Sequence, residues 1–109
     1  AAGMHTTPHD LALFSSTLLK DEKSTFIGQK LLKEKWISEL MKPVEATGNR
    51  MSISYFIDEE NESVGFSGYN RGWIALTRTI VGRNYGYAIL TNSNISPITN
   101  EVDALILKR

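Results

Sequence analysis

The segment Gly65–Trp73 brings together, within nine residues, groups that could do chemistry. Ser67 offers a hydroxyl, Gly68 allows close approach of a ligand to the backbone, and Arg71 could contact an anion. Three glycines in this short stretch also resemble a phosphate-binding loop. However, no Gly-Lys-Ser/Thr follows, and the residues after Gly72 predict a strand, so nucleotide binding is not expected. From its residues alone the segment favours ordinary strand and turn packing, with a cleft-lining role as the alternative.

The other polar clusters favour structural roles. His5 and His9 lie four residues apart, but His5 precedes the expected helix start, so no metal site is predicted. The acidic run Asp58–Glu62 is predicted to be the solvated turn of a hairpin rather than a carboxylate pair or a calcium site. The chain has no cysteine, which excludes disulfides, thiolate metal sites and cysteine nucleophiles. No cofactor is implied by any of these residues.

Length and charge set further bounds. A chain of 109 residues is one domain or part of one. Twelve basic and twelve acidic residues cancel, so no overall attraction for nucleic acid is expected. No apolar run approaches the ~20 residues of a membrane helix, so no membrane insertion is expected. The chain opens on Ala1 rather than methionine, which indicates a processed or trimmed start. A targeting segment could lie upstream, so the compartment stays open.

Two helices are expected in the helical segment 1–43. The first begins at Thr7-Pro8, where threonine caps and proline suits the first turn. The second covers 33–41 and is stopped by Pro43. Their apolar stripes fall at helical spacing: Leu11, Phe14 and Leu18 in the first helix, and Trp36, Ile37, Leu40 and Met41 in the second.

The pattern of residues 51–109 predicts a sheet followed by a terminal helix. Strands are expected at 51–57, 63–67, 73–81 and 85–91, and their short connections predict an antiparallel meander. Ser96-Pro97 opens the last helix, which should pack across the sheet. Its expected buried stripe is Ile98, Val102, Leu105 and Ile106, and Trp36, Tyr55, Trp73, Tyr85 and Tyr87 are expected in core and sheet packing. The fold class is therefore α+β.

The order of several short motifs resembles the C-terminal part of the serine β-lactamase and penicillin-binding-protein fold. The likeness is strongest to the branch of class C β-lactamases, D-Ala-D-Ala carboxypeptidases and family VIII esterases, and it covers nearly the whole chain. The matching pieces are Asp10-Leu11-Ala12-Leu13-Phe14, Gln29-Lys30-Leu31-Leu32, Leu40-Met41-Lys42-Pro43, the segment Gly65–Trp73, and Leu90-Thr91-Asn92-Ser93. The resemblance implies that the chain is part of a β-lactamase-like transpeptidase fold.

Catalysis in that family needs a Ser-x-x-Lys nucleophile, a Tyr-x-Asn-type loop and a His/Lys-Ser/Thr-Gly strand. The first two are not found in this chain, so no catalytic residue is assigned. The third is matched by Phe66-Ser67-Gly68, followed by Tyr69 and Asn70. The resemblance implies that these five residues line the substrate cleft, with the backbone N–H of Tyr69 as an oxyanion donor.

Phe66 departs from the family pattern because it stands in the His/Lys position. A phenyl ring carries no charge and donates no hydrogen bond, so anchoring of a substrate carboxylate there is in doubt. An apolar residue fits an uncharged ester better than a β-lactam or a peptide carboxylate. It fits a catalytically inactive homologue equally well.

The resemblance implies a C-terminal fragment of a serine hydrolase that acts on β-lactams, D-amino-acid peptides or esters through an acyl-serine. The fragment alone should be inactive, and its expected partner is the N-terminal half of the fold or a second copy. The family tends to be periplasmic or extracellular. Two alternatives stay open: a non-catalytic module of the same fold that binds a peptide, a cell-wall fragment or another subunit, and a small independent α+β interaction domain. A half-fold should show an unpaired sheet edge and an exposed apolar face.

Overall fold

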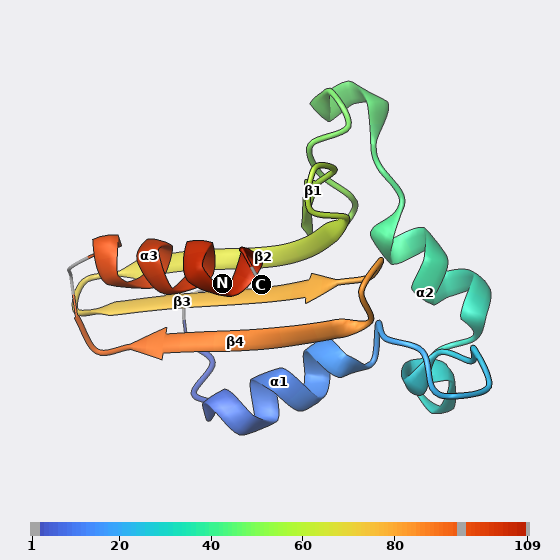
Figure 1. The fold of residues 1–109 in the computed structure, drawn as a ribbon, viewed down its shortest axis with the longest axis horizontal. Helices are drawn as coiled ribbons and strands as arrows, with labels where there is room; N and C mark the ends of the chain where they lie inside the picture. Colours follow the sequence, from blue (N-terminus) through green and yellow to red (C-terminus); the bar gives the residue numbers. More distant parts are fainter. Residues whose placement is uncertain (1–2, 94–95, 109) are drawn as a thin grey trace.

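The chain folds into a four-stranded antiparallel sheet with strand order β1-β2-β3-β4 (Figure 1). The computed structural model describes residues 3–93 and 96–108. This architecture confirms the α+β class and the antiparallel meander that the hairpin spacing predicts. The elements in chain order are α1 (Pro8–Ser16), η1 (Ile27–Lys30), α2 (Glu34–Met41), η2 (Glu45–Thr47), β1 (Phe56–Asp58), β2 (Ser63–Asn70), β3 (Trp73–Ile80), β4 (Tyr85–Thr91) and α3 (Ser96–Leu107).

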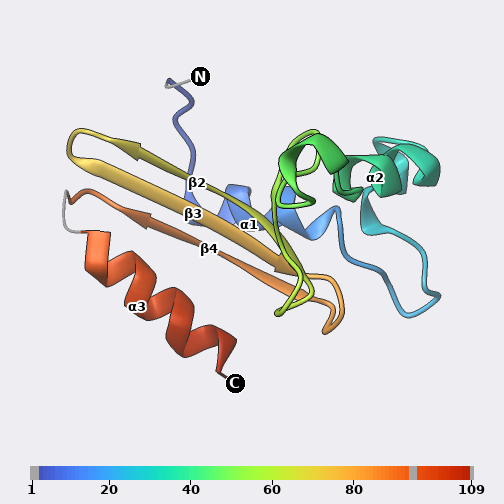
Figure 2. The same cartoon turned by 90° about the horizontal axis from the view of Figure 1, so that it is seen from above.

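Helices α1 and α3 cover opposite faces of the sheet, as Figure 2 shows. Thr79 donates a hydrogen bond to the carbonyl of Ser15 in α1, whereas the neighbouring Arg78 bonds to Asp103 in α3. Adjacent residues of a strand point to opposite faces, so the two helices lie on opposite sides of β3. Both helices pack on β3 and β4, which leaves the outer half of β2 open. Among the described residues no helix is long and apolar enough to cross a membrane.

The main core lies where the helical segment meets the first residues of β2. Leu18, Phe26, Ile37 and Val64 form one buried cluster. The start of α1 is fixed as predicted, because the backbone N–H of Asp10 donates to the capping hydroxyl of Thr7 at 3.1 Å. Because the buried cluster joins the segment 17–55 to the first residues of β2, this segment packs against one end of the sheet rather than across its face.

The prediction of a strand over 51–57 is wrong for its first five residues. The backbone N–H groups of Ser54 and Tyr55 donate to the hydroxyl of Ser52, at 3.2 and 2.9 Å, and close a tight turn. Ile53, at the tip of this turn, is 72% exposed. Serine hydroxyls compete with ladder hydrogen bonds in this way, so the apolar alternation of 51–57 masked a turn.

The buried stripe predicted for the last helix is also largely wrong. α3 begins at Ser96 as expected, but it turns Thr99 and Asp103 toward the sheet. Ile98, Val102 and Leu105 are 48%, 37% and 64% exposed, and only Ile106 is half-buried. Phe14, Trp36 and Trp73, for which the sequence pattern predicts burial, are likewise exposed. Several apolar surfaces of the described chain therefore face solvent.

Candidate functional site

The five residues that the sequence marks as cleft-lining all lie on the outer half of β2. β1 pairs only with the first three residues of β2, Ser63 to Gly65. Across residues 3–93 and 96–108, no other strand pairs with the outer side of 66–70. Phe66 and Tyr69 are 54% and 63% exposed. The segment 66–70 is thus an open sheet edge, the kind of edge that can accept a further strand or an extended ligand.

The strand divides these five residues between its two faces. Ser67 and Tyr69 stand opposite Leu76 and Ile74 of β3 on the face that carries α3. Phe66, Gly68 and Asn70 alternate with them. The ring of Phe66 stacks on that of Phe56, with ring centres 5.7 Å apart and planes 23° apart. Because β1 begins at Phe56, the two rings meet where the paired part of the edge ends.

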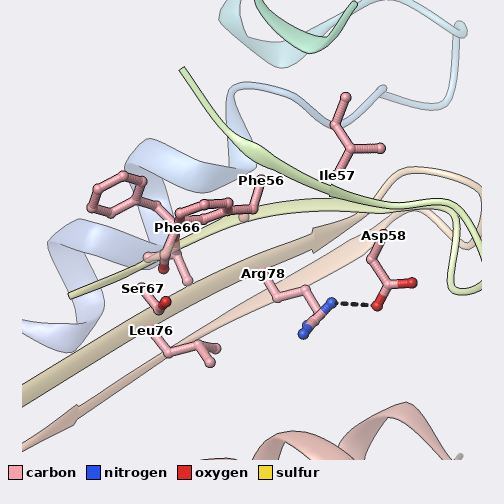
Figure 3. Close-up of a pocket in the computed structure, with 9 residues that line it drawn as sticks. Phe56, Ile57, Asp58, Phe66, Ser67, Leu76 and Arg78 are labelled. Carbon is pink, nitrogen blue, oxygen red and sulfur yellow. Dashed lines mark hydrogen bonds and ion pairs between the residues drawn. The ribbon is translucent and has the colours of Figure 1, made fainter. Parts of the chain in front are cut away.

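A cavity of about 170 Å³ lies beside this aromatic pair (Figure 3). The Phe56 and Phe66 rings form one end, and Asp58 and Arg78 form the other. Ser67 and Leu76 lie along its side, and Gly65 also lines it. A Cβ at Gly65 would lie 2.2 Å from the carbonyl oxygen of Thr77, so only glycine fits there without movement of the backbone.

The polar end of the cavity is a cluster that joins all four strands of the sheet to α3. Arg78 Nη1 donates to Asp58 Oδ2 at 2.9 Å and to Ser63 Oγ at 3.0 Å. Arg78 Nε and Nη2 donate to the two oxygens of Asp103 at 2.9 and 2.8 Å. The hydroxyl of Tyr87, on β4, donates to Asp103 at 2.5 Å. Two carboxylates thus share one guanidinium, which leaves a formal surplus of one negative charge.

The surroundings hold these groups in defined protonation states. Partial burial raises the pKa of Asp58, but hydrogen bonds from Asn61 and the charge of Arg78 outweigh burial and leave this pKa below its ordinary value. Burial lowers the pKa of Arg78, and the contacts with Asp103 more than reverse this effect. Burial and the hydrogen bond to Asp103 both raise the pKa of Tyr87. At neutral pH, Asp58 is therefore a carboxylate, Arg78 a cation and Tyr87 a neutral phenol.

A second opening, of about 300 Å³, lies between the outer half of β2 and the first turns of α3. It is lined by Gly68, Tyr69 and Thr99 among others, and it shares Ser67 and Leu76 with the first cavity. The two openings therefore border one another at Ser67 and Leu76. We call the two openings together the β2 groove. It runs from Phe56 to Tyr69.

Four of the five residues for which the resemblance implies a cleft-lining role lie along the groove. Phe66, Ser67, Gly68 and Tyr69 line it, but Asn70 and Arg71 do not. Phe56, Asp58 and Arg78 line it and were missed by the sequence reasoning. The available signal was Arg78 itself, a charged residue in the middle of a strand with buried neighbours, which must have a carboxylate partner.

The groove offers groups for binding rather than an activated nucleophile. No lysine or histidine lines either opening beside Ser67, and the carboxylate of Asp58, which also lines the groove, is engaged by Arg78. Within the described part of the chain, no cluster of three or more His, Asp or Glu side chains is placed to hold a metal ion. The groove can accept an apolar group at the phenylalanine pair and a polar group at Asp58.

Comparisons of this chain with protein-family models, with curated proteins and with solved structures returned no match. The case for a function therefore rests on the sequence motifs and on the geometry of the β2 groove.

Proposed function

We propose that this chain forms the C-terminal, sheet-bearing part of a serine hydrolase related to β-lactamases. In this proposal β2 is one wall of the substrate cleft, and the remainder of the fold supplies the nucleophile and its activating lysine. The reaction would be acyl transfer from a β-lactam, a D-amino-acid peptide or an ester to serine, followed by hydrolysis. The motif order from Asp10 to Ser93 carries the family assignment.

The observation that most supports the proposal is an open sheet edge together with uncovered apolar stripes. The edge is 66–70, and the main stripe is Ile98, Val102 and Leu105 on the outer side of α3. Leu13 and Phe14 of α1 are 55% and 60% exposed on the other side of the sheet. Monomeric proteins seldom leave large contiguous apolar patches in water, and stripes of this kind mark interaction surfaces. An open edge and exposed apolar stripes are both expected of one part of a fold that is separated from the other part.

Within this proposal Ser67 contributes a cleft hydroxyl rather than the attacking group. Phe66, in the position where the family carries a cation, favours an uncharged ester or amide over a substrate held by a carboxylate. Arg78 does not replace that cation, because its guanidinium is engaged by Asp58 and Asp103.

A non-catalytic binding module of the same fold is the second candidate. It is favoured by the same substitution at Phe66 and by the absence of a lysine or histidine beside Ser67 among the residues that line the groove. In this version the β2 groove binds a peptide, a cell-wall fragment or another subunit without turnover.

The test is the intact native mass of the purified particle, with any companion chain sequenced and the particle exposed to a fluorophosphonate probe and a fluorescent penicillin. The hydrolase proposal predicts a companion segment with Ser-x-x-Lys that takes up at least one probe, and no label on residues 1–109 alone. A lone, unlabelled chain would reject the hydrolase and leave the binding module. Replacement of Ser67 by alanine should weaken labelling of the companion without abolishing it, because Ser67 lines the cleft but is not acylated.

A further inference from the structure

We propose that the cavity between the Phe56–Phe66 pair and Asp58 binds a cationic, ammonium-bearing group attached to a small apolar body. If the chain is part of a hydrolase, as proposed above, this group would belong to its substrate. The binding preference itself follows from the residues that line the cavity.

The aromatic end supplies the first attraction. Phe56 and Phe66 present partly exposed rings, 45% and 54% exposed, that stack 5.7 Å apart. The face of an aromatic ring is negative and attracts an ammonium group within about 6 Å of its centre. The same rings, with Leu76, offer apolar surface to the body of the ligand. This end of the cavity therefore suits an apolar amine better than an apolar acid.

The polar end of the cavity also attracts a cation. Asp58 lines the cavity with its side chain 32% exposed, and Asp103 stands behind Arg78 with 13% exposed. The two carboxylates outnumber the single guanidinium. Tyr87 is neutral, because its raised pKa keeps its proton on the oxygen that donates to Asp103. The cluster thus keeps a surplus negative charge close to the ring pair.

The turn that follows β1 extends the negative field. Glu59, Glu60 and Glu62 come directly after Asp58 and are exposed. Arg78 is the one basic residue among the described residues that line the two openings of the groove. Four of its N–H groups already donate to Asp58, Ser63 and Asp103, so little of its charge is left for an anionic ligand. A carboxylate would therefore enter a site with a net field against it.

The test compares three probes of nearly equal shape: phenethylammonium, 2-phenylethanol and 3-phenylpropionate. They are titrated into the ¹⁵N-labelled 109-residue chain while its amide signals are recorded. The ammonium should bind with a Kd on the order of 1–10 mM, as expected for a fragment of this size. It should shift the amides of Gly65, Phe66 and Ser67, and bind about fivefold or more tightly than the alcohol. Raising the salt from about 0.05 to about 0.5 M should remove most of that difference.

Introduction of a positive charge at the ring pair gives the sharpest variant. Phe66→Lys places a cation at the cavity and should weaken ammonium binding by about tenfold while making 3-phenylpropionate the preferred probe. Trp73→Lys is the matched control, because it also replaces an exposed aromatic ring by lysine, on the neighbouring strand β3, at a position that lines neither opening of the groove. It should change ammonium affinity by no more than about threefold.

Three results would overturn the inference: tighter binding of the carboxylate than of the ammonium, equal binding of ammonium and alcohol, or amide shifts that map away from β1 and β2. Absence of saturable binding by the wild-type chain would also reject it. The readout requires no turnover, so a failure here is separate from a failure to find a serine nucleophile in a companion segment.

Discussion

Asp103→Ala should release α3 from the sheet, because this carboxylate is the principal polar attachment of the helix. It accepts two hydrogen bonds from Arg78 and one from Tyr87, and its side chain is 13% exposed. The apolar stripe of α3 faces away from the sheet, so Ile98, Val102 and Leu105 contribute little to this attachment. The helix therefore depends on a charge-assisted cluster rather than on apolar burial.

The magnitude follows from the loss of one partner of a mostly buried ion pair. Removing one member of such a pair costs about 3–5 kcal/mol, because the other charge stays buried. Arg78 keeps Asp58 and Ser63 as acceptors after the change, which favours the lower end of that range. With Arg78 only 19% exposed, little solvent is available to screen the loss. We expect the free energy of unfolding to fall by about 3 kcal/mol, a factor of roughly a hundred in the folding equilibrium constant.

Urea titration followed by far-ultraviolet circular dichroism measures this change, with Glu101→Ala as the matched control. Glu101 lies on the same helix and is exposed, so its removal should change the free energy of unfolding by about 0.5 kcal/mol or less. Both changes introduce alanine, so a general gain in helix propensity is shared. A loss below about 1 kcal/mol for Asp103→Ala, or equal losses for both variants, would refute the view that this cluster holds α3.

Three further predictions concern Asp58, Gly65 and Leu105. The pKa of Asp58 is lowered on folding, so its contribution to stability is complete above the unfolded pKa of about 3.9 and is lost as the pH falls through the lower folded value. The urea midpoints of the wild type and of Asp58→Asn should therefore converge in acid. A gap between the two midpoints that stays constant with pH would contradict this prediction. Gly65→Ala should cost about 1–3 kcal/mol by overpacking against Thr77, while Gly68→Ala, whose added methyl group would meet no atom within 4 Å, should be nearly neutral in the same titration. Leu105→Glu should weaken association of the chain with its companion segment or with a second copy, as measured by sedimentation. It should leave the urea midpoint of the isolated chain unchanged, and a large fall in that midpoint would mean that Leu105 is buried within the chain.

Strands β2, β3 and β4 and the helix starts were predictable because their determinants are local. Thr7 caps α1 through Asp10, and Pro43 follows the end of α2. The strand predicted at 85–91 matches β4, since short turns fix hairpin boundaries. In each case the residues that decide the structure lie within a few positions of it.

The exposed apolar stripe of α3 was not predictable, because the sequence pattern does not say which partner a stripe will meet. Ile98, Val102 and Leu105 have the spacing of a core face. Asp103, on another side of the same helix, instead meets Arg78 of the sheet. Burying Arg78 without a carboxylate would be costly, and this requirement decides the rotation of the helix. The local pattern and the non-local charge pair conflict, and the charge pair prevails.

The candidate site shows the same division between local and non-local information. The motif around Ser67 indicated one strand of the groove, but its charge is set by partners that only the sheet register brings together. Phe56 stands opposite Gly65, and Gly65 stands opposite Arg78, so three strands contribute one row of the cavity. Gly65 has no side chain between Phe56 and Arg78 in this row. The ion pair of Arg78 with Asp58 removes the cation that a carboxylate-binding cleft would need. The uncharged ring of Phe66 and the pairing of Arg78 therefore act in the same direction, against an anionic ligand at the proposed site.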